Sequence, residues 1–425
     1  MLARAEFRTE SGVSFFMDTQ SMVLYKGDRV TPLFTETLPT DPEFLGRFNR
    51  TTKDSSPKTL RISLGQACNY SCNYCSQKDL GDPSERPPRL ATMTFMDQLH
   101  ETLNLSGLEK IELWGGETLL YWPDILNIMD NLDREGLTWY IPTNGTPLMM
   151  KHVEYLAGLK GRVGIGISHD GPGHEALRGK EFLHKKVEVL KAIQDTQGKV
   201  QFSLNPVISS TNYDLMGINE FFRSFLDANG LLPVSLNFEL CRAYGDQGSA
   251  DNVIQNEDLL TYRAGLRKYL DAHTEQFRSK GYTREGDLLV TNLFHTGQGV
   301  IPLAQSFRYE TFPVTQTNCG VDDSKLLSVD LDGSVKVCQN TDQRYIKGNL
   351  RDLKEVVMTG VTYRATGECL GCPVARLCKG SCPIDVGPRN FEINHSVEWA
   401  HYSEILLSAL SLLFSSRVAF ADTPR

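Results

Sequence analysis

Strand-like and helix-like segments alternate six times along this 425-residue sequence, and this alternation limits the fold more than any other feature. The strand-like segments are apolar and rich in β-branched residues, and the segments between them carry apolar residues at helical spacing. Strands are expected near residues 59–64, 110–114, 137–142, 162–167, 199–207 and 233–240. Helices are expected near residues 94–104, 123–135, 147–159, 181–196, 214–227 and 256–280.

Successive strand–helix units predict a parallel sheet with right-handed crossovers and a covering layer of helices. Six units are fewer than a closed eightfold barrel contains, so we expect an α/β fold, a partial (β/α)6 TIM-like barrel. Functional residues of such folds gather at the carboxyl ends of the strands. The segments that directly follow the strands are therefore the places to look for chemistry.

Composition excludes several classes of protein. A net charge of −8 argues against a nucleic-acid partner, since such proteins present a basic face to phosphates. The start of the chain becomes charged at once, so no signal peptide is expected, and the longest apolar run, 405–414, is too short to span a bilayer. With ten cysteines in metal-ligand spacings, we expect a cytoplasmic protein without a membrane partner.

Three cysteines, Cys68, Cys72 and Cys75, follow the first expected strand in the spacing Cys-x3-Cys-x2-Cys. A four-iron cluster is normally held by four thiolates, so three leave one iron open to another ligand. The alternatives are a partial zinc site and three packed core cysteines. Zinc loops more often combine a Cys-x2-Cys pair with a distant second pair, so the spacing favours an iron–sulfur cluster.

This loop, with Tyr74 before its last cysteine, resembles the cluster loop of the radical S-adenosylmethionine (radical SAM) enzymes. The resemblance extends over residues 58–400. It implies a 4Fe-4S cluster and S-adenosyl-L-methionine as cofactors, with the methionine amino and carboxylate groups on the open iron. It also implies reductive cleavage of that cofactor to a 5′-deoxyadenosyl radical, which takes a hydrogen atom from the substrate.

Turns after the following strands resemble the cofactor-binding motifs of the same family. A Gly-Gly-Glu motif holds the methionine ammonium in the family, and glycines let the backbone approach a ligand closely. Asn144 resembles the family's polar turn near the ribose, although a plain turn is an equal alternative, and Arg178 has the forked donors that suit a carboxylate. The implied cofactor-binding residues are Gly115, Gly116, Glu117, Asn144, Ser168 and Arg178. The last match departs from the family, because Glu175 stands where the motif has aspartate.

Cys241 follows the sixth expected strand. As a catalytic residue it could donate a hydrogen atom to a radical, or it could be a cluster ligand. A packed core cysteine is the alternative for this position.

Beyond residue 315 the alternation gives way to turns and six further cysteines. A hairpin is expected from 327–331 and 335–337. The cysteine spacings resemble the SPASM extension of radical SAM enzymes, which holds two auxiliary four-iron clusters. By this resemblance the first auxiliary cluster takes Cys319, Cys338 and Cys382, and the second takes Cys369, Cys372 and Cys378. A zinc ion on the last four of these cysteines is the alternative.

The family pattern ends with one more cysteine, which this chain lacks after Cys382. The second auxiliary cluster would therefore use a non-cysteine ligand such as His395 or His401, keep an open iron, or be absent. The first cluster also lacks an upstream fourth thiolate, for which Cys241 is the only spare cysteine.

Five segments are expected along the chain. They are an N-terminal β-hairpin segment (1–57), the radical SAM partial barrel (58–285), a linker (286–314), a SPASM-like iron–sulfur domain (315–392) and a C-terminal helix (393–425).

Radical SAM enzymes with SPASM extensions act mostly on peptides and proteins, so a precursor peptide and a small-protein or flavodoxin-type reductant are the expected partners. Sulfatase maturases carry an acidic base after the hairpin cysteine, whereas Gln339 follows Cys338 here. Since an amide is a poor proton acceptor, we expect a crosslink in a ribosomally made peptide, with sulfatase-type oxidation or epimerisation as alternatives. An iron–sulfur electron carrier and a structural zinc protein are the alternatives from other classes.

Overall fold

The computed structural model describes residues 4–19, 22–28, 33, 51–77, 89–243, 250–280, 287–309, 319–341, 345–358, 369, 371–380, 382 and 388–421. No helix within these ranges combines the length and the apolar character needed to cross a bilayer.

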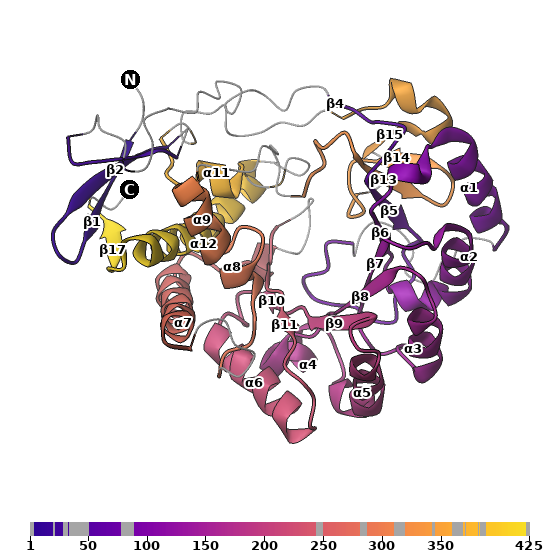
Figure 1. The fold of residues 1–425 in the computed structure, drawn as a ribbon, viewed down its shortest axis with the longest axis horizontal. Helices are drawn as coiled ribbons and strands as arrows, with labels where there is room; N and C mark the ends of the chain where they lie inside the picture. The colour runs from indigo at the N-terminus through magenta and orange to yellow at the C-terminus, as the bar shows by residue number, and fades with distance from the viewer. Residues whose placement is uncertain are drawn as a thin grey trace.

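A nine-stranded sheet forms the centre of the fold, in the order β11-β9-β8-β7-β6-β5-β13-β14-β15 (Figure 1). Six adjacent strands run parallel, as the alternation in the sequence predicts. They are β5 (Thr59–Ser63), β6 (Lys110–Trp114), β7 (Thr138–Thr143), β8 (Arg162–Ile167), β9 (Val200–Leu204) and β11 (Ser235–Leu236). The expected α/β fold, a partial (β/α)6 barrel, is confirmed.

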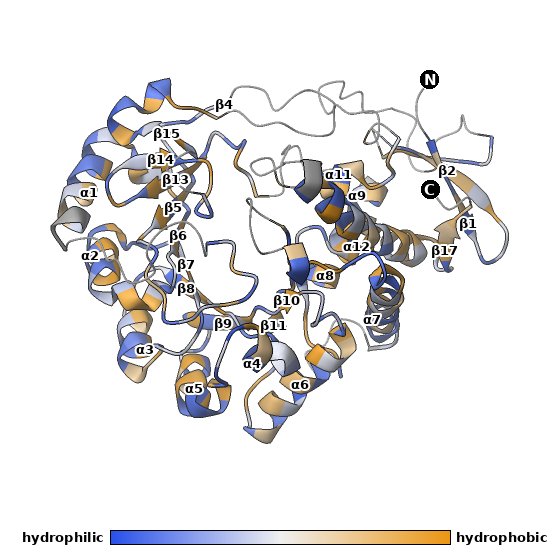
Figure 2. Cartoon of the chain, turned by 180° about the vertical axis from the view of Figure 1, so that it is seen from behind, coloured by the Kyte–Doolittle hydropathy of each residue, from blue (hydrophilic) through white to orange (hydrophobic). Residues whose placement is uncertain are grey.

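Helices cover the outer side of these strands (Figure 1). They are α1 (Arg89–Thr102), α2 (Trp122–Leu132), α3 (Met150–Ala157), α5 (Val187–Asp195) and α6 (Leu215–Ala228). In α2, the buried residues Ile125, Ile128, Met129 and Leu132 share one face because they recur every three or four positions. Figure 2 shows the resulting mixture of hydrophobic and hydrophilic residues on α1, α2, α3 and α5.

The helix expected over 181–196 is shorter in the structure. A single turn, α4 (His174–Leu177), follows β8, and a 3-10 turn at Leu183–Lys186 leads into α5. The start of α4 is preceded by Gly171, whose φ of 67° lies in the left-handed region that glycine tolerates. The segment between Asp170 and α5 is therefore shaped as a compact loop at the carboxyl end of β8.

The hairpin expected around Gly333 is present, and it extends the barrel sheet. Strand β13 (Leu326–Asp330) pairs antiparallel with β14 (Ser334–Lys336), which pairs with β15 (Ile346–Asn349). On its other side β13 pairs in parallel with β5, the strand that leads to Cys68. The second cysteine-rich region is thereby attached to the same sheet as the first.

The remaining elements form a second layer around α12 (Pro388–Phe414), which packs against α7 (Leu259–Lys280). The segment expected as a linker holds two helices, α8 (Asn292–His295) and α9 (Val300–Tyr309), and α9 also packs on α12. The apolar run at 405–414 lies within α12, where Leu406, Ala409 and Leu410 are fully buried. The C-terminal segment is thus a helix over only part of the range expected for it.

A small separate sheet joins the two ends of the described chain. Its order is β17-β1-β2-β3, with β1 at Arg4–Thr9, β2 at Ser14–Asp18, β3 at Leu24–Tyr25 and β17 at Val418–Phe420. The expected hairpin corresponds to β2 and β3, whereas β1 and β17 were not expected. Phe7 of β1 pairs with Phe420 of β17, so residues from both ends share one sheet (Figure 1).

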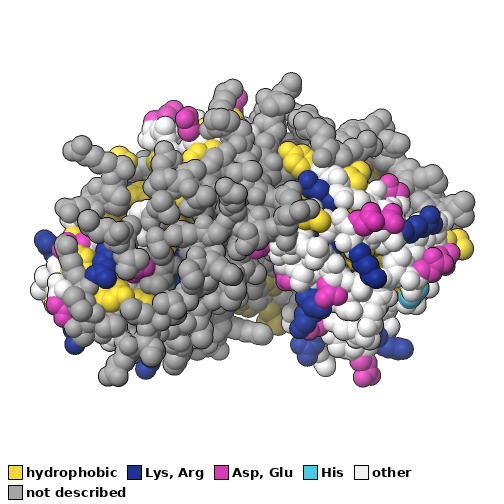
Figure 3. Space-filling model, turned by 90° about the horizontal axis from the view of Figure 1, so that it is seen from above, with side chains coloured by type: hydrophobic (Ala, Val, Ile, Leu, Met, Phe, Trp, Pro, Cys, Tyr) yellow, Lys and Arg dark blue, Asp and Glu magenta, His cyan; other side chains and the backbone are white. Residues whose placement is uncertain are grey.

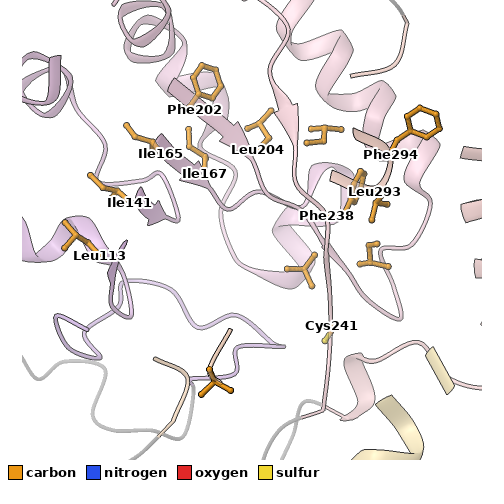
Figure 4. Close-up of a cluster of buried hydrophobic side chains, with 14 of the residues drawn as sticks. Leu113, Ile141, Ile165, Ile167, Phe202, Leu204, Phe238, Cys241, Leu293 and Phe294 are labelled. Atoms are coloured by element: carbon orange, nitrogen blue, oxygen red, sulfur yellow. The ribbon is translucent and has the colours of Figure 1, made fainter. Parts of the chain in front are cut away.

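The core of the barrel consists of the inward side chains of successive strands. Figure 4 shows Ile141, Ile165, Ile167 and Leu204 on neighbouring strands, with Phe238 further along the chain. Cys241 lies beyond Phe238 on the same segment and is 6% exposed. On the face seen in Figure 3, acidic and basic side chains are interspersed over the described part, which gives that part no single sign of charge.

Candidate active site

A cavity of about 930 Å³ lies at the carboxyl ends of the parallel strands, where sites of this architecture are expected. It is bordered by the first cysteine loop and by the turns after β6, β7 and β8. The expected site residues that line it are Cys68, Cys72, Cys75, Gly115, Gly116, Glu117, Asn144, Ser168, Arg178 and Cys241. The six cysteines beyond residue 315 are not among the lining residues.

Backbone hydrogen bonds attach the first cysteine loop to the turn after β6. The amide of Gly116 donates to the carbonyl of Gly65 at 2.9 Å, and the amide of Glu117 donates to that of Ala67 at 2.8 Å. The Ala67 amide in turn donates to the hydroxyl of Tyr121 at 2.6 Å. These hydrogen bonds therefore fix the start of the cysteine loop beside the Gly-Gly-Glu turn.

Gly116 is required by this close approach. A β-carbon at residue 116 would lie 2.3 Å from the carbonyl oxygen of Gln66 and 2.6 Å from that of Ala67. These are backbone atoms, so they could move only if the cysteine loop moved. At Gly115 the same atom would lie 3.2 Å from the ring of Tyr121, a much milder contact.

The Glu117 carboxylate connects the turns after β6 and β7. It is 1% exposed and accepts hydrogen bonds from the Leu119 amide at 2.9 Å, the Thr143 hydroxyl at 2.6 Å and the Asn144 amide at 2.6 Å. Burial raises the pKa of Glu117, and these donors oppose the rise. A carboxylate has about four acceptor positions, so one remains for a further donor.

Arg178 is held in place by Asp170 and by the cysteine loop. Its Nε lies 2.8 Å from Asp170 Oδ2, and its guanidinium lies 5.2 Å from the ring centre of Tyr74. The Tyr74 hydroxyl donates to the same Asp170 oxygen, and the Val207 amide donates to the other at 2.9 Å. Burial would lower the pKa of Arg178, but the Asp170 carboxylate raises it above its ordinary value, so a permanent positive charge borders the cavity.

Asn144 and Ser168 occupy the turns after β7 and β8. The Asn144 side chain donates to Asn69 Oδ1 at 2.7 Å, which ties its turn to the first cysteine loop. The Ser168 amide donates to the Thr143 carbonyl at 2.8 Å, so the two turns are also joined to each other. Both residues line the cavity.

The three cysteines of the first loop are close enough to affect one another electrostatically. Burial raises the pKa of Cys72 to about 11, the Arg178 charge lowers it, and negative charge on Cys75 or Cys68 would raise it further. Burial likewise raises the pKa of Cys68. Among the residues that the structure describes, no three His, Cys, Asp or Glu side chains converge as a single metal ion requires. Cluster assembly would therefore draw the thiols together and release their protons.

Glu239, which the sequence did not single out, also lines the cavity. It lies in the short strand β12 (Glu239–Leu240), which pairs in parallel with β10 (Val207–Ile208). The Glu239 side chain is exposed to solvent through the cavity. Desolvation by the surrounding protein nevertheless raises the pKa of Glu239, and the positive charges of Arg178 and Arg242 oppose this rise. An acidic residue near the end of the sixth expected strand was the only signal available in the sequence.

Cys241 follows β12 and keeps its thiol protonated. Its amide donates to the Ile208 carbonyl at 2.9 Å, and burial raises its pKa to about 12. A protonated thiol bordering the cavity has a hydrogen atom to donate. It is also a buried core side chain, so the structure is consistent with both readings of this cysteine.

The first expected auxiliary set lies beside the first loop. Burial raises the pKa of Cys338 to about 12, and negative charges on Cys319 and Cys382 would raise it further, so these three thiols are neighbours. Gln77, which follows the first loop, donates to the Gln339 carbonyl at 3.3 Å and to Asn340 Oδ1 at 3.1 Å. The hairpin end that carries Cys338 therefore flanks the cavity.

The second expected set lies on a compact turn near α12. The Cys372 amide donates to the Cys369 carbonyl at 3.2 Å, and α11 (Ala375–Cys378) positions Cys378. The Cys378 thiol donates to Glu398 Oε2 at 3.3 Å. Of the histidines expected as ligands, His401 instead forms a 2.6 Å hydrogen bond through Nδ1 with the Tyr262 hydroxyl, and it lines the main cavity.

A partial barrel with a three-cysteine loop at its mouth defines a class of enzyme, and comparison with known proteins agrees. Residues 62–216 match the model of the Radical SAM superfamily. This match identifies a radical SAM domain within the chain, and that superfamily consists of enzymes with a 4Fe-4S cluster and S-adenosyl-L-methionine as cofactors.

Similar proteins include "Radical SAM cyclopropyl synthase TigE" of Paramaledivibacter caminithermalis, which is 21% identical over 364 residues, or 79% of this chain and 70% of the relative. GTP 3′,8-cyclase of Staphylococcus epidermidis is 33% identical over 120 residues, which cover 26% of this chain and only 34% of the cyclase. The solved structure of anSMEcpe with bound AdoMet superimposes with a TM-score of 0.61 at 18% identity, covering 85% of this chain and 99% of that one. This likeness shows a common fold.

The donor set fits these cofactors. Three thiols from one loop border a cavity that also exposes a fixed guanidinium, a carboxylate with one remaining acceptor position and a glycine turn without β-carbons. Anionic and cationic groups of an amino acid would thus meet partners of opposite charge beside the cysteine loop.

Proposed function

We propose that the protein is a peptide maturase that forms a new bond, a crosslink, in a ribosomally made precursor peptide. The observation that carries this proposal is the convergence of the cysteine loop, the Gly-Gly-Glu turn and Arg178 on one cavity. When bound, the cluster and S-adenosyl-L-methionine would supply a 5′-deoxyadenosyl radical that removes a hydrogen atom from the substrate. The protein itself binds, orients and encloses the reacting groups.

Each lining residue has a role in this proposal. Cys68, Cys72 and Cys75 hold the cluster. The terminal nitrogens of Arg178, whose Nε is already bonded to Asp170, bind the methionine carboxylate, with Ser168 beside it. Glu117 uses its remaining acceptor position for the methionine ammonium, and the turn at Asn144 lies next to the ribose. These interactions would fix the cofactor before any substrate enters.

The cavity has room for a peptide segment beside the cofactor. Its volume of about 930 Å³ is at the upper end of the range of about 300–1,000 Å³ typical of small-molecule sites. A relative with the same fold, anSMEcpe, has been solved with bound AdoMet and a Cp18Cys peptide. These two observations support a peptide as the substrate class.

The position of Gln339 argues against oxidation of the sulfatase type. Its side-chain oxygen accepts a hydrogen bond from the Cys338 thiol at 3.3 Å, and an amide cannot serve as a general base. Of the two carboxylates among the described residues that line the cavity, Glu117 is engaged by three donors, whereas Glu239 faces the open space. We assign to Glu239 the acceptance of the proton that the substrate loses.

The substrate loses a hydrogen atom to the radical and a proton to Glu239, and when the new bond forms it must also give up one electron. The auxiliary clusters would accept this electron. Cys319, Cys338 and Cys382 would hold the first of them, next to the cavity, and Cys369, Cys372 and Cys378 the second. A flavodoxin-type protein would return electrons to the system.

Mass spectrometry of a precursor peptide co-expressed with the enzyme tests the proposal. A new carbon–carbon bond, either between two residues or as a ring within one, removes two hydrogens from the peptide. Unchanged mass with deuterium uptake from heavy water would show epimerisation through a thiol such as that of Cys241. A Cys72→Ala variant is the control, since it should leave the peptide unmodified.

A further inference from the structure

Three cysteines of the second auxiliary set supply one ligand fewer than a four-iron cluster normally has. Backbone hydrogen bonds order the turn that carries the set, with the Cys372 amide donating to the Cys369 carbonyl at 3.2 Å and the Cys378 amide to the Val374 carbonyl at 2.8 Å. As at the first loop, the described side chains do not converge as a single metal ion requires, so assembly of a cluster would draw them together. A fourth donor, where the cluster has one, would be a side chain that packs against this turn.

Glu398 of α12 is in contact with this set. Its Oε2 accepts a hydrogen bond from the Cys378 thiol at 3.3 Å, and its residue is 1% exposed. A carboxylate buried so deeply is costly unless it is paired. Glu398 lies one turn before His401 on α12, and its contact with Cys378 places it against α11.

Arg242 orients Glu398. The Arg242 Nε lies 2.5 Å from Glu398 Oε1, which leaves Oε2 directed at Cys378. Metal ligands in proteins are regularly oriented by a further side chain that hydrogen-bonds to the ligand and does not itself bind the metal. Arg242 also lines the main cavity, so this one side chain lies between Glu398 and the substrate space.

We propose that Glu398 is the fourth ligand of an iron–sulfur cluster held by Cys369, Cys372 and Cys378. The inference rests on the proposed second auxiliary cluster. The carboxylate has the same charge as the thiolate that it replaces, and on assembly the Cys378 proton is released to solvent while both groups bind iron. His401 is excluded from this role by its bond to Tyr262, and the His395 ring stacks on Phe391 at 5.2 Å.

The test uses a background in which Cys68, Cys72 and Cys75 are replaced by alanine, so that only auxiliary iron remains. In this background Glu398→Gln is expected to give a labile cluster that loses one iron on mild oxidation and shows the electron paramagnetic resonance signal of a three-iron cluster. Glu398→Cys is expected to keep all its iron but to shift the signal of the reduced cluster. A purely structural role for Glu398 would make cysteine no better than glutamine.

Glu404 provides a matched control on the same helix. It is buried and paired with Arg263 and Arg267, but its ion pairs do not involve a cysteine, so Glu404→Gln should leave the iron content and the spectrum unchanged. Identical spectra and iron content for Glu398→Gln and the background would overturn the assignment. If Cys369→Ala with Cys372→Ala also removed no iron, the second cluster itself would be refuted, while cofactor cleavage by the wild type would still test the proposed function separately.

Discussion

Arg178 and Asp170 form a buried ion pair, with Nε and Oδ2 2.8 Å apart, across the loop that follows β8. Asp170 is fully buried, and it also receives the Tyr74 hydroxyl from the cysteine loop. One carboxylate thus fixes both the arginine that borders the cavity and the aromatic residue of the cluster loop. A change at Asp170 is therefore expected to affect both the position of Arg178 and the position of the cluster loop.

Replacing Asp170 with asparagine should weaken binding of S-adenosyl-L-methionine. The amide would leave Arg178 without its charged partner, and a hydrogen bond to a charged group contributes about 1.5–3 kcal/mol. The dissociation constant, measured by anaerobic titration calorimetry, is expected to rise at least tenfold. Arg178→Lys should give a similar loss, because an ammonium cannot bond Asp170 and a carboxylate with the same fork. Unchanged affinity in both variants would refute the role of this pair.

Gly116→Ala should displace the cysteine loop. The added β-carbon would meet two backbone carbonyls at 2.3 Å and 2.6 Å, so the loop must shift to accept it. We expect loss of iron from the first cluster and of cofactor cleavage, measured by iron analysis and chromatography. Gly115→Ala is the matched control: its new atom meets the Tyr121 ring at 3.2 Å, and most of the iron should be retained. Equal effects of the two variants would count against the close-approach argument.

Glu239→Gln should separate cofactor cleavage from product formation. The glutamine keeps the size of the side chain but cannot accept a proton, and general-base catalysis contributes about 10²–10⁴-fold. Peptide product is expected to fall by about that factor, whereas 5′-deoxyadenosine should still form without substrate. Simultaneous liquid chromatography of both products provides the measurement. A variant with full product formation would remove Glu239 from the mechanism.

Acid should destabilise the fold through His273. Burial lowers the pKa of His273 to about 3, so the folded state keeps this ring neutral at pH values where the unfolded chain binds a proton. Stability is therefore complete above about pH 6.5 and decreases as the pH falls below it, by about 1.4 kcal/mol per pH unit for this residue. Urea unfolding of the apoprotein at several pH values should show a smaller decrease for His273→Phe.

The sequence predicted the parts of the fold that depend on local patterns. Alternating apolar runs located the six parallel strands, and the short spacing of Cys68, Cys72 and Cys75 located the mouth of the cavity. Pairing between strands that lie far apart in the sequence could not be predicted from local patterns. The parallel pairing of β13 with β5 and the antiparallel pairing of β17 with β1 depend on long-range packing that periodicity does not encode.

The site was predictable where its residues form motifs and not where they act through space. Gly116 and Arg178 lie in recognisable turns, but the contact of Glu398 with Cys378 joins residues from α12 and α11 that share no motif. Glu239 was missed because a single acidic residue in a short strand such as β12 is not a motif. The linker expected at 286–314 contains α8 and α9, whose short lengths give weak helical periodicity.

The proposal that Cys68, Cys72 and Cys75 hold the cluster that cleaves the cofactor is tested most directly by anaerobic turnover without peptide. Reconstituted, reduced wild-type enzyme should convert S-adenosyl-L-methionine to 5′-deoxyadenosine, and Cys241→Ser should do the same. Cys68→Ala should form none. Formation of 5′-deoxyadenosine by Cys68→Ala, or its absence from the wild type, would contradict the proposal.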